Sequence, residues 1–382
     1  MPRDRTVAIA GTRGYPSYYG GLETAVRKIA PYLADNGWTV TVLGTESDTV
    51  ADDPGRDPRI HTVSVWSLRT RSLSKLSSGL ASTVSMLRHP PDVALVMSTA
   101  LGFWLPLLRA RGITTVVNTD GLEWKRDKWG TAAKFVLHAA ARATARWADE
   151  LIFDARAIAD FWEAHFGRSG TFIPYGGDPL PSPQLPEGLP SKGYVLMVAR
   201  FVPENTVPEF FEAVPVIAAK TPVVIVGSSG FGGGLDDDAR TLARTFPSVT
   251  WLGHVRDDAL LNALYAHAGV YFHGHSVGGT NPSLVQAMAV GAPVVARDTV
   301  YNREVLGDEG VFCSPAPQDI AAAVNSLMQD SARRAEIGAA NHERASREYT
   351  WELVCAAYAR VLENAVSGAR HRPRRSRPAA GR

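Results

Sequence analysis

Short apolar runs alternate with longer amphipathic segments along the whole chain, which is typical of a parallel β-sheet flanked by helices. The sequence therefore predicts an α/β fold. In the first half, strands are expected at residues 6–10, 39–43, 60–65, 93–98, 114–118, 150–153 and 171–173, with the clearest helices at 22–36 and 134–149. In the second half, strands are expected at 194–198, 223–226, 249–252, 270–272, 294–296 and 310–313, separated by helical segments.

A proline-rich segment separates the two halves. Residues 178–193 contain five prolines, a density that neither a helix nor a central strand tolerates. A chain of 382 residues is about twice what one hydrophobic core usually organises. We therefore expect two doubly wound Rossmann-like domains, at 1–177 and 194–349, joined by this linker. Such sheets bind ligands at the carboxyl ends of their strands, so a site is expected between the domains.

Composition and charge restrict the cellular location that the sequence predicts. The only two cysteines, Cys313 and Cys355, indicate neither a disulfide framework nor a metal site, which fits a reducing cytosol. The amino terminus shows no secretory signal, and the most apolar stretch, 93–108, is shorter than the roughly 20 residues of a membrane span. A cytoplasmic protein is predicted. The net charge of +2 hides an arginine-rich tail at 368–382, whose proline and glycine content predicts disorder.

Glycines precede an expected helix in the first half. Gly20 and Gly21 follow the first strand and a loop, at a helix start whose free N–H groups and dipole favour an anion such as a diphosphate. The Rossmann fingerprint and the P-loop ending are both absent. A surface loop with turn glycines is an equal alternative.

A second glycine-rich passage, 271–296, is predicted to form a strand, a loop, a helix and another strand. Its helix start offers backbone amides and small polar side chains to an anion. The candidate donor-binding residues here are Gly279, Thr280, Asn281, Ser283, Leu284 and Gln286. His273 and His275 lie two apart at the strand end without an evident third ligand, so we expect them to order the loop and contact a sugar.

This passage, together with the runs 11–23 and 118–126, resembles the family-four nucleotide-sugar glycosyltransferases of GT-B fold, and within them the bacterial rhamnosyltransferase-type branch. The resemblance covers roughly residues 5–360. It implies two facing Rossmann-like domains, a nucleotide-sugar bound mainly by the second, and a helix at 350–367 that crosses back to the first. It also implies a retaining mechanism with no metal and no cofactor beyond the nucleotide-sugar substrate.

The sequence departs from the family pattern at three donor positions. The family carries two glutamates where this chain has Gly278 and Gln286; the first normally contacts the donor sugar and the second the ribose. The family also places an Arg and a Lys against the diphosphate. Arg200 is present, with a surface ion pair as its alternative role, but Asn205 stands at the Lys position.

The resemblance leaves the catalytic residues less defined. Asp120 lies where the family often has a His and is a candidate to polarise a hydroxyl group, with Glu123 as the second candidate. An N-cap or Asx-turn role for Asp120 is an equal alternative. Glu304 matches a family glutamate that contacts ribose or sugar, its alternative being an ordinary acid at a helix start.

The predicted function is transfer of rhamnose or another hexose from a nucleoside-diphosphate sugar to a saccharide or lipid-linked acceptor. A non-catalytic nucleotide-sugar-binding protein and a GT-B epimerase are the alternatives. Residues 59–91 carry Arg69, Arg71, Lys75 and Arg88 among leucines; such a basic amphipathic face suits an anionic membrane, although a solvated helix face fits equally. No nucleic-acid partner is expected.

Overall fold

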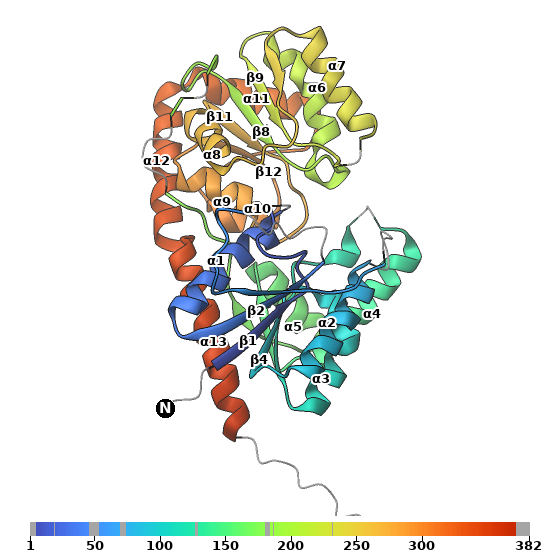
Figure 1. The fold of residues 1–382 in the computed structure, drawn as a ribbon. Coiled ribbons are helices and arrows are strands. Elements are labelled where there is room, and N and C mark those ends of the chain that lie inside the picture. The colour runs from blue at the N-terminus through green and yellow to red at the C-terminus, as the bar shows by residue number, and fades with distance from the viewer. Residues whose placement is uncertain are drawn as a thin grey trace, which may run out of the picture.

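The computed structural model describes residues 5–18, 20–45, 53–68, 74–126, 129–179, 184–185, 187–230 and 232–371. The predicted α/β class is confirmed, because two parallel sheets with helices on their faces make up two domains (Figure 1). Parts of the proline-rich linker, Arg69, Arg71 and the end of the basic tail (372–382) lie outside the described residues.

Within these described ranges, the first sheet has seven parallel strands in the order β3-β2-β1-β4-β5-β6-β7. Its strands are β1 (Arg5–Ala10), β2 (Trp38–Gly44), β3 (His61–Ser64), β4 (Val93–Val96), β5 (Thr114–Asn118), β6 (Glu150–Phe153) and β7 (Thr171–Phe172). Its helices are α1 (Gly21–Asp35), α2 (Ser74–Arg88), η2 (Thr99–Trp104), α3 (Leu105–Arg111), η3 (Glu123–Lys125), α4 (Thr131–Trp147) and α5 (Arg156–Phe166).

The described part of the second domain has six parallel strands in the order β10-β9-β8-β11-β12-β13, the doubly wound dinucleotide-binding order. Its strands are β8 (Val195–Val198), β9 (Val223–Val226), β10 (Val249–Trp251), β11 (Val270–His273), β12 (Val294–Arg297) and β13 (Val311–Cys313). Its helices are η4 (Pro203–Asn205), α6 (Val207–Ala218), α7 (Gly234–Thr245), α8 (Asp258–His267), α9 (Pro282–Ala289), α10 (Val300–Leu306), α11 (Pro317–Gln329) and α12 (Ser331–Glu348).

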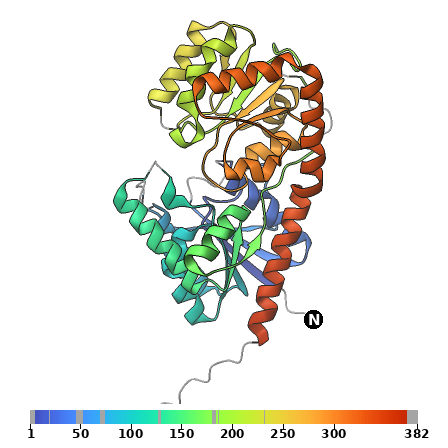
Figure 2. The same ribbon diagram turned by 180° about the vertical axis from the view of Figure 1, so that it is seen from behind.

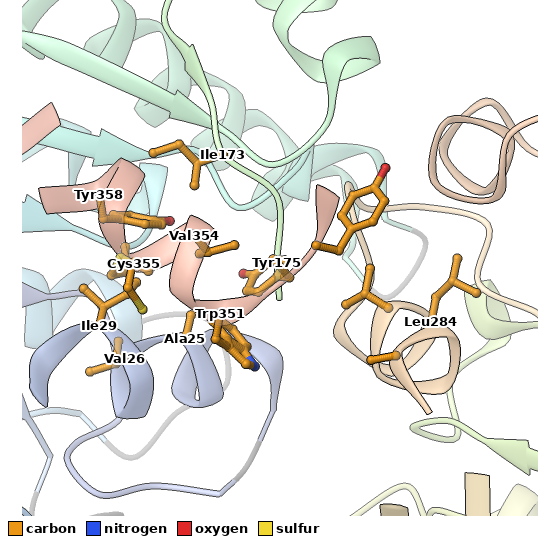
Figure 3. Close-up of a cluster of buried hydrophobic side chains, with 14 of the residues drawn as sticks. Ala25, Val26, Ile29, Ile173, Tyr175, Leu284, Trp351, Val354, Cys355 and Tyr358 are labelled. Atoms are coloured by element: carbon orange, nitrogen blue, oxygen red, sulfur yellow. The ribbon is translucent and has the colours of Figure 1, made fainter. Parts of the chain in front are cut away.

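The last helix, α13 (Trp351–His371), returns from the second domain and packs on α1, β4 and β5 of the first, as Figure 2 shows from behind. The chain passes between the domains at Gly177 and again at Tyr349. These two segments lie side by side, because the N–H of Gly177 donates to the carbonyl of Tyr349 at 2.7 Å. One cluster of buried hydrophobic side chains continues across this junction. Figure 3 shows it, with Tyr175 and Trp351 between the first domain and Leu284 of α9.

Candidate functional site

The carboxyl ends of the two sheets face each other, and several residues there make contacts between the domains. The backbone N–H of Thr280, in the loop after β11, donates to the carbonyl of Asp154, directly after β6, at 2.9 Å. The Thr280 hydroxyl donates to the same carbonyl at 2.5 Å. This edge is where doubly wound sheets bind ligands, so the candidate site lies between the domains.

The two predicted helix starts are brought together. Gly20 is the N-cap of α1, and α9 begins at Pro282 with Asn281 as its cap, whose Oδ1 accepts from the N–H of Ser283 at 3.0 Å. A Cβ on Gly21 would lie only 2.4 Å from Cγ of Pro282. Only glycine allows this approach, so the helix starts are in direct contact at this point rather than separated by a gap.

The loop before α9 packs on the first domain. A Cβ on Gly279 would lie 2.2 Å from the carboxyl carbon of Asp154, so this position also requires glycine. Gly278 has a φ of 119°, and the Cα of Gly278 would be 3.5 Å from a Cβ on Gly121. The loop that the sequence assigns to the donor therefore also forms part of the interdomain contact.

Seven of the predicted donor-binding side chains are bonded to protein groups or buried in the core, namely Thr280, Asn281, Ser283, Leu284, Gln286, Asn205 and Glu304. Gln286 pairs with the linker, accepting from the N–H of Asp178 at 2.9 Å and donating to its carbonyl at 3.0 Å. The Asn205 amide donates to the carbonyl of Arg200 at 2.9 Å, and Leu284 is fully buried in the core. Their roles toward a donor stay predictions.

Glu304 is one of these residues and joins the domains directly. Its carboxylate accepts from the backbone N–H of Arg156 at 2.8 Å and from that of Ala157 at 3.3 Å, at the start of α5. A carboxylate at this end of a helix satisfies free N–H groups and complements the dipole. In this structure Glu304 therefore caps a helix of the opposite domain.

Asp120 has the geometry of a reactive group. Its φ of 49° is unusual for a residue other than glycine, and such strain clusters at functional sites. The Asx-type bond is made by Asn118, whose Oδ1 accepts from the N–H of Asp120 at 2.8 Å. Among the described residues, no hydrogen bond engages the Asp120 carboxylate. Burial raises the pKa of this carboxyl, with the charges of Lys75 and Arg126 opposing the shift.

Glu123 is held by its neighbours. Its Oε1 accepts from Trp129 at 3.0 Å, and its Oε2 pairs with Nε of Arg126 at 2.9 Å. Burial lowers the pKa of Arg126, but the carboxylates of Glu123, Asp120, Glu204 and Asp154 outweigh it and raise that pKa. Glu123 is therefore suited to position Arg126, which leaves Asp120 as the better candidate for direct chemistry.

The charges of Arg200, in the second domain, and Arg126, in the first, both act on His275. Arg200 is exposed after β8, and its guanidinium has no hydrogen-bond or ion-pair partner within the described ranges. His275 stacks on His273 with ring centroids 4.4 Å apart. Burial lowers the pKa of His273 to about 3, and burial and His273 lower that of His275 well below its ordinary value. Both imidazoles are therefore neutral at pH 7.

Three residues of this site were missed by the sequence analysis: Arg126, Asp154 and Glu204. Asp154 follows a buried strand just as Asp120 does, which is a usable signal. Glu204 is 5% exposed, and neither of its carboxylate oxygens has a hydrogen-bond partner among the described residues. Within the described part of the chain, no three His, Cys, Asp or Glu side chains are grouped so as to hold a metal ion.

Two parallel-sheet domains facing across such a site define the GT-B class. Residues 20–176 match the model of the glycosyl transferase 4-like domain, and residues 192–330 match that of the glycosyl transferases group 1. These consecutive matches assign the chain to the GT-B glycosyltransferases.

Individual relatives support this assignment. A phosphatidyl-myo-inositol mannosyltransferase of Mycolicibacterium smegmatis is 33% identical over 58% of this chain and 59% of its own, so the chain spans about three fifths of that relative. A GDP-mannose-dependent alpha-mannosyltransferase of the same species is 27% identical over 91% of this chain and 94% of its own. Sucrose-phosphate synthase from Thermosynechococcus elongatus has the same fold, with a TM-score of 0.79 at 18% identity over 95% of this chain and all of its own.

Proposed function

We propose that this protein is a retaining, metal-independent glycosyltransferase that moves a hexose from a nucleoside-diphosphate sugar to a saccharide or lipid-linked acceptor. The observation that carries the proposal is the exposed Arg200 guanidinium at the strand-order reversal of the second sheet, with Arg126 of the first domain nearby. A guanidinium binds phosphate oxygens with two hydrogen bonds. The mannosyltransferase relatives favour mannose as the sugar, and the motifs favour rhamnose.

The residues have separate parts in this proposal. Arg200 binds the diphosphate and stabilises the negative charge that develops on the leaving nucleoside diphosphate. Asp120 accepts a proton or hydrogen bond from the attacking acceptor hydroxyl. The charges of both guanidinium groups act on the neutral imidazole of His275. Retention requires the acceptor to attack the face that the nucleotide leaves, so both groups act on one side of the sugar.

Arg200→Ala is expected to raise KM for the donor about 10- to 100-fold, because a charge-assisted hydrogen bond contributes about 1.5–3 kcal/mol. The measurement is product formation from GDP-mannose, UDP-glucose and dTDP-rhamnose with a saccharide acceptor panel. Arg240→Ala, on the surface of α7, is the matched control and should behave as the wild type. A fully active Arg200→Ala variant would exclude the phosphate contact.

A non-catalytic nucleotide-sugar-binding protein is the second candidate. It is favoured because Gly278 offers no side chain and because Gln286 and Asn205 are bonded to protein groups. Donor binding without turnover across the same panel would support it.

We propose further that the first domain contacts an anionic membrane through its α3 and α4 helices. Phe135 is 74% exposed at the start of α4, next to Val136. Basic side chains are exposed on the same helices, namely Arg109, Arg111, Arg142 and Arg146. None of the described helices is both long and apolar enough to cross a membrane, and a surface of this kind suits contact with one leaflet.

Phe135→Ser is expected to weaken binding to vesicles containing phosphatidylglycerol about 10-fold, since burying an aromatic side chain contributes about 1.5–3 kcal/mol. Cosedimentation measures it, with neutral phosphatidylcholine vesicles for comparison. Val216→Ser, at another exposed apolar position, on α6 of the second domain, should have no effect. Equal vesicle binding by all three proteins would refute the surface.

A further inference from the structure

Glu204 is a buried carboxylate without a partner. Its residue is 5% exposed, and both Oε1 and Oε2 are buried without any hydrogen bond in the described chain. Unpaired buried carboxylates are costly and rare, so each one requires an explanation. The backbone of Glu204 is well fixed, because its carbonyl accepts from the N–H and the hydroxyl of Ser276 at 2.9 and 2.7 Å. Loose packing of the loop therefore does not explain the missing partner.

Other unpartnered polar atoms occur in the same region, near the guanidinium of Arg126. Nδ1 of His275 and Oδ1 of Asp154 are also buried without hydrogen bonds to any part of the chain that the structure describes. These groups lie along the 275–279 loop, because Ser276 bonds the Glu204 carbonyl, Gly279 packs on the Asp154 carboxyl, and a Cβ on Gly278 would lie 4.0 Å from Nη2 of Arg126. A set of hydrogen-bonding atoms that lacks partners suits a ligand with several hydroxyl groups.

Arg126 does not satisfy Glu204. Its Nε is paired with Glu123 at 2.9 Å, and no ion pair between Arg126 and Glu204 is present. The described residues also contain no group of three potential metal ligands at this place. An internal ion pair and a metal site are therefore both poorer explanations than a hydroxylated ligand.

The missing side chain at Gly278 indicates a role for the unpaired carboxylate of Glu204. Gly278 has no side chain, and a Cβ built on it would lie 4.0 Å from Nη2 of Arg126. Glu204 lies beside the same loop, through Ser276, two residues before Gly278. We propose that Glu204 accepts hydrogen bonds from hydroxyl groups of the transferred sugar and so supplies the carboxylate that position 278 lacks. The proposal rests on the function proposed above and makes Glu204 a specificity-determining residue.

The test compares Glu204→Gln with the wild type by calorimetric binding of three matched pairs: GDP and GDP-mannose, UDP and UDP-glucose, dTDP and dTDP-rhamnose. Glu204→Gln should weaken the nucleotide-sugar about 10- to 100-fold and the matching nucleoside diphosphate less than about 3-fold. It should also raise the melting temperature of the free protein, because a neutral amide costs less to bury without partners than a carboxylate does. Glu212→Gln, exposed on α6, is the control and should change neither quantity.

Each outcome of these measurements either supports or overturns the proposed role of Glu204. Equal weakening of the nucleotide-sugar and the nucleoside diphosphate, or no weakening of either, would overturn the role of Glu204 while leaving the proposed function standing. A lower melting temperature for both Glu204→Gln and Glu204→Asp would assign the carboxylate a structural role instead. If the wild type binds none of the six nucleotides, the proposed function fails, and the role of Glu204 fails with it.

Discussion

Replacing Asp120 with asparagine is expected to lower turnover by about 100-fold or more, while donor affinity changes little. General acid–base catalysis contributes about 100- to 10,000-fold, and an amide cannot take up a proton. Asp120 fits this role because its carboxylate is not engaged by any hydrogen bond in the described chain. Its backbone is also held at a φ of 49° by the hydrogen bond from its own N–H to Oδ1 of Asn118. Asparagine has nearly the same size, so the geometry should persist.

The pH profile tests the same role. Burial raises the pKa of Asp120 above its ordinary value, so the fraction in the base form increases as the pH rises through that raised pKa. The wild type should therefore lose activity on the acid side, and Asp120→Asn should lose that limb of the profile. Asp160→Asn, exposed on α5, is the matched control. An Asp120→Asn enzyme with normal turnover and an unchanged acid limb would assign the residue to loop conformation alone.

The fold was predictable because fully buried parallel strands are continuous apolar runs. Val93–Val96 and Val223–Val226 stand out in this way, and both form interior strands of their sheets. The bounds of the α10 helix, Val300–Leu306, were not predictable, since seven residues are too few to display a helical period. The prolines indicated the linker, but its pairing with Gln286 joins residues 108 positions apart and left no local signal.

The candidate site was predictable only where strand ends mark it. Asp120 and Arg200 follow buried strands, and both lie at the interdomain edge. Asp154 does so too and was missed only because no motif drew attention to it. Glu304 shows the limit of this reasoning, because a local pattern cannot reveal that its carboxylate caps α5 of the other domain. The unpaired state of Glu204 likewise depends on every neighbour brought in by the fold.

Asp154→Asn is expected to stabilise the protein strongly at neutral and alkaline pH. Burial, reinforced by the charge of Asp120, raises the pKa of the Asp154 carboxyl from 3.8 to about 7. The folded state therefore keeps its proton to about pH 7, whereas the unfolded chain releases it near pH 4. The stability linked to this proton is complete below pH 4 and is lost as the pH rises to 7, at a cost of about 4 kcal/mol at most.

Asparagine matches the protonated carboxyl in size and has no charge to desolvate, so it avoids this loss. Denaturant unfolding should show Asp154→Asn more stable than the wild type by about 2–4 kcal/mol at pH 8, with the difference small at pH 4. Its packing on Gly279 should be retained. Asp160→Asn should follow the wild type at both values, because that side chain is exposed. A stability difference that does not vary with pH would show that Asp154 is already ionised in the folded protein and that a partner for its charge exists at the interdomain edge.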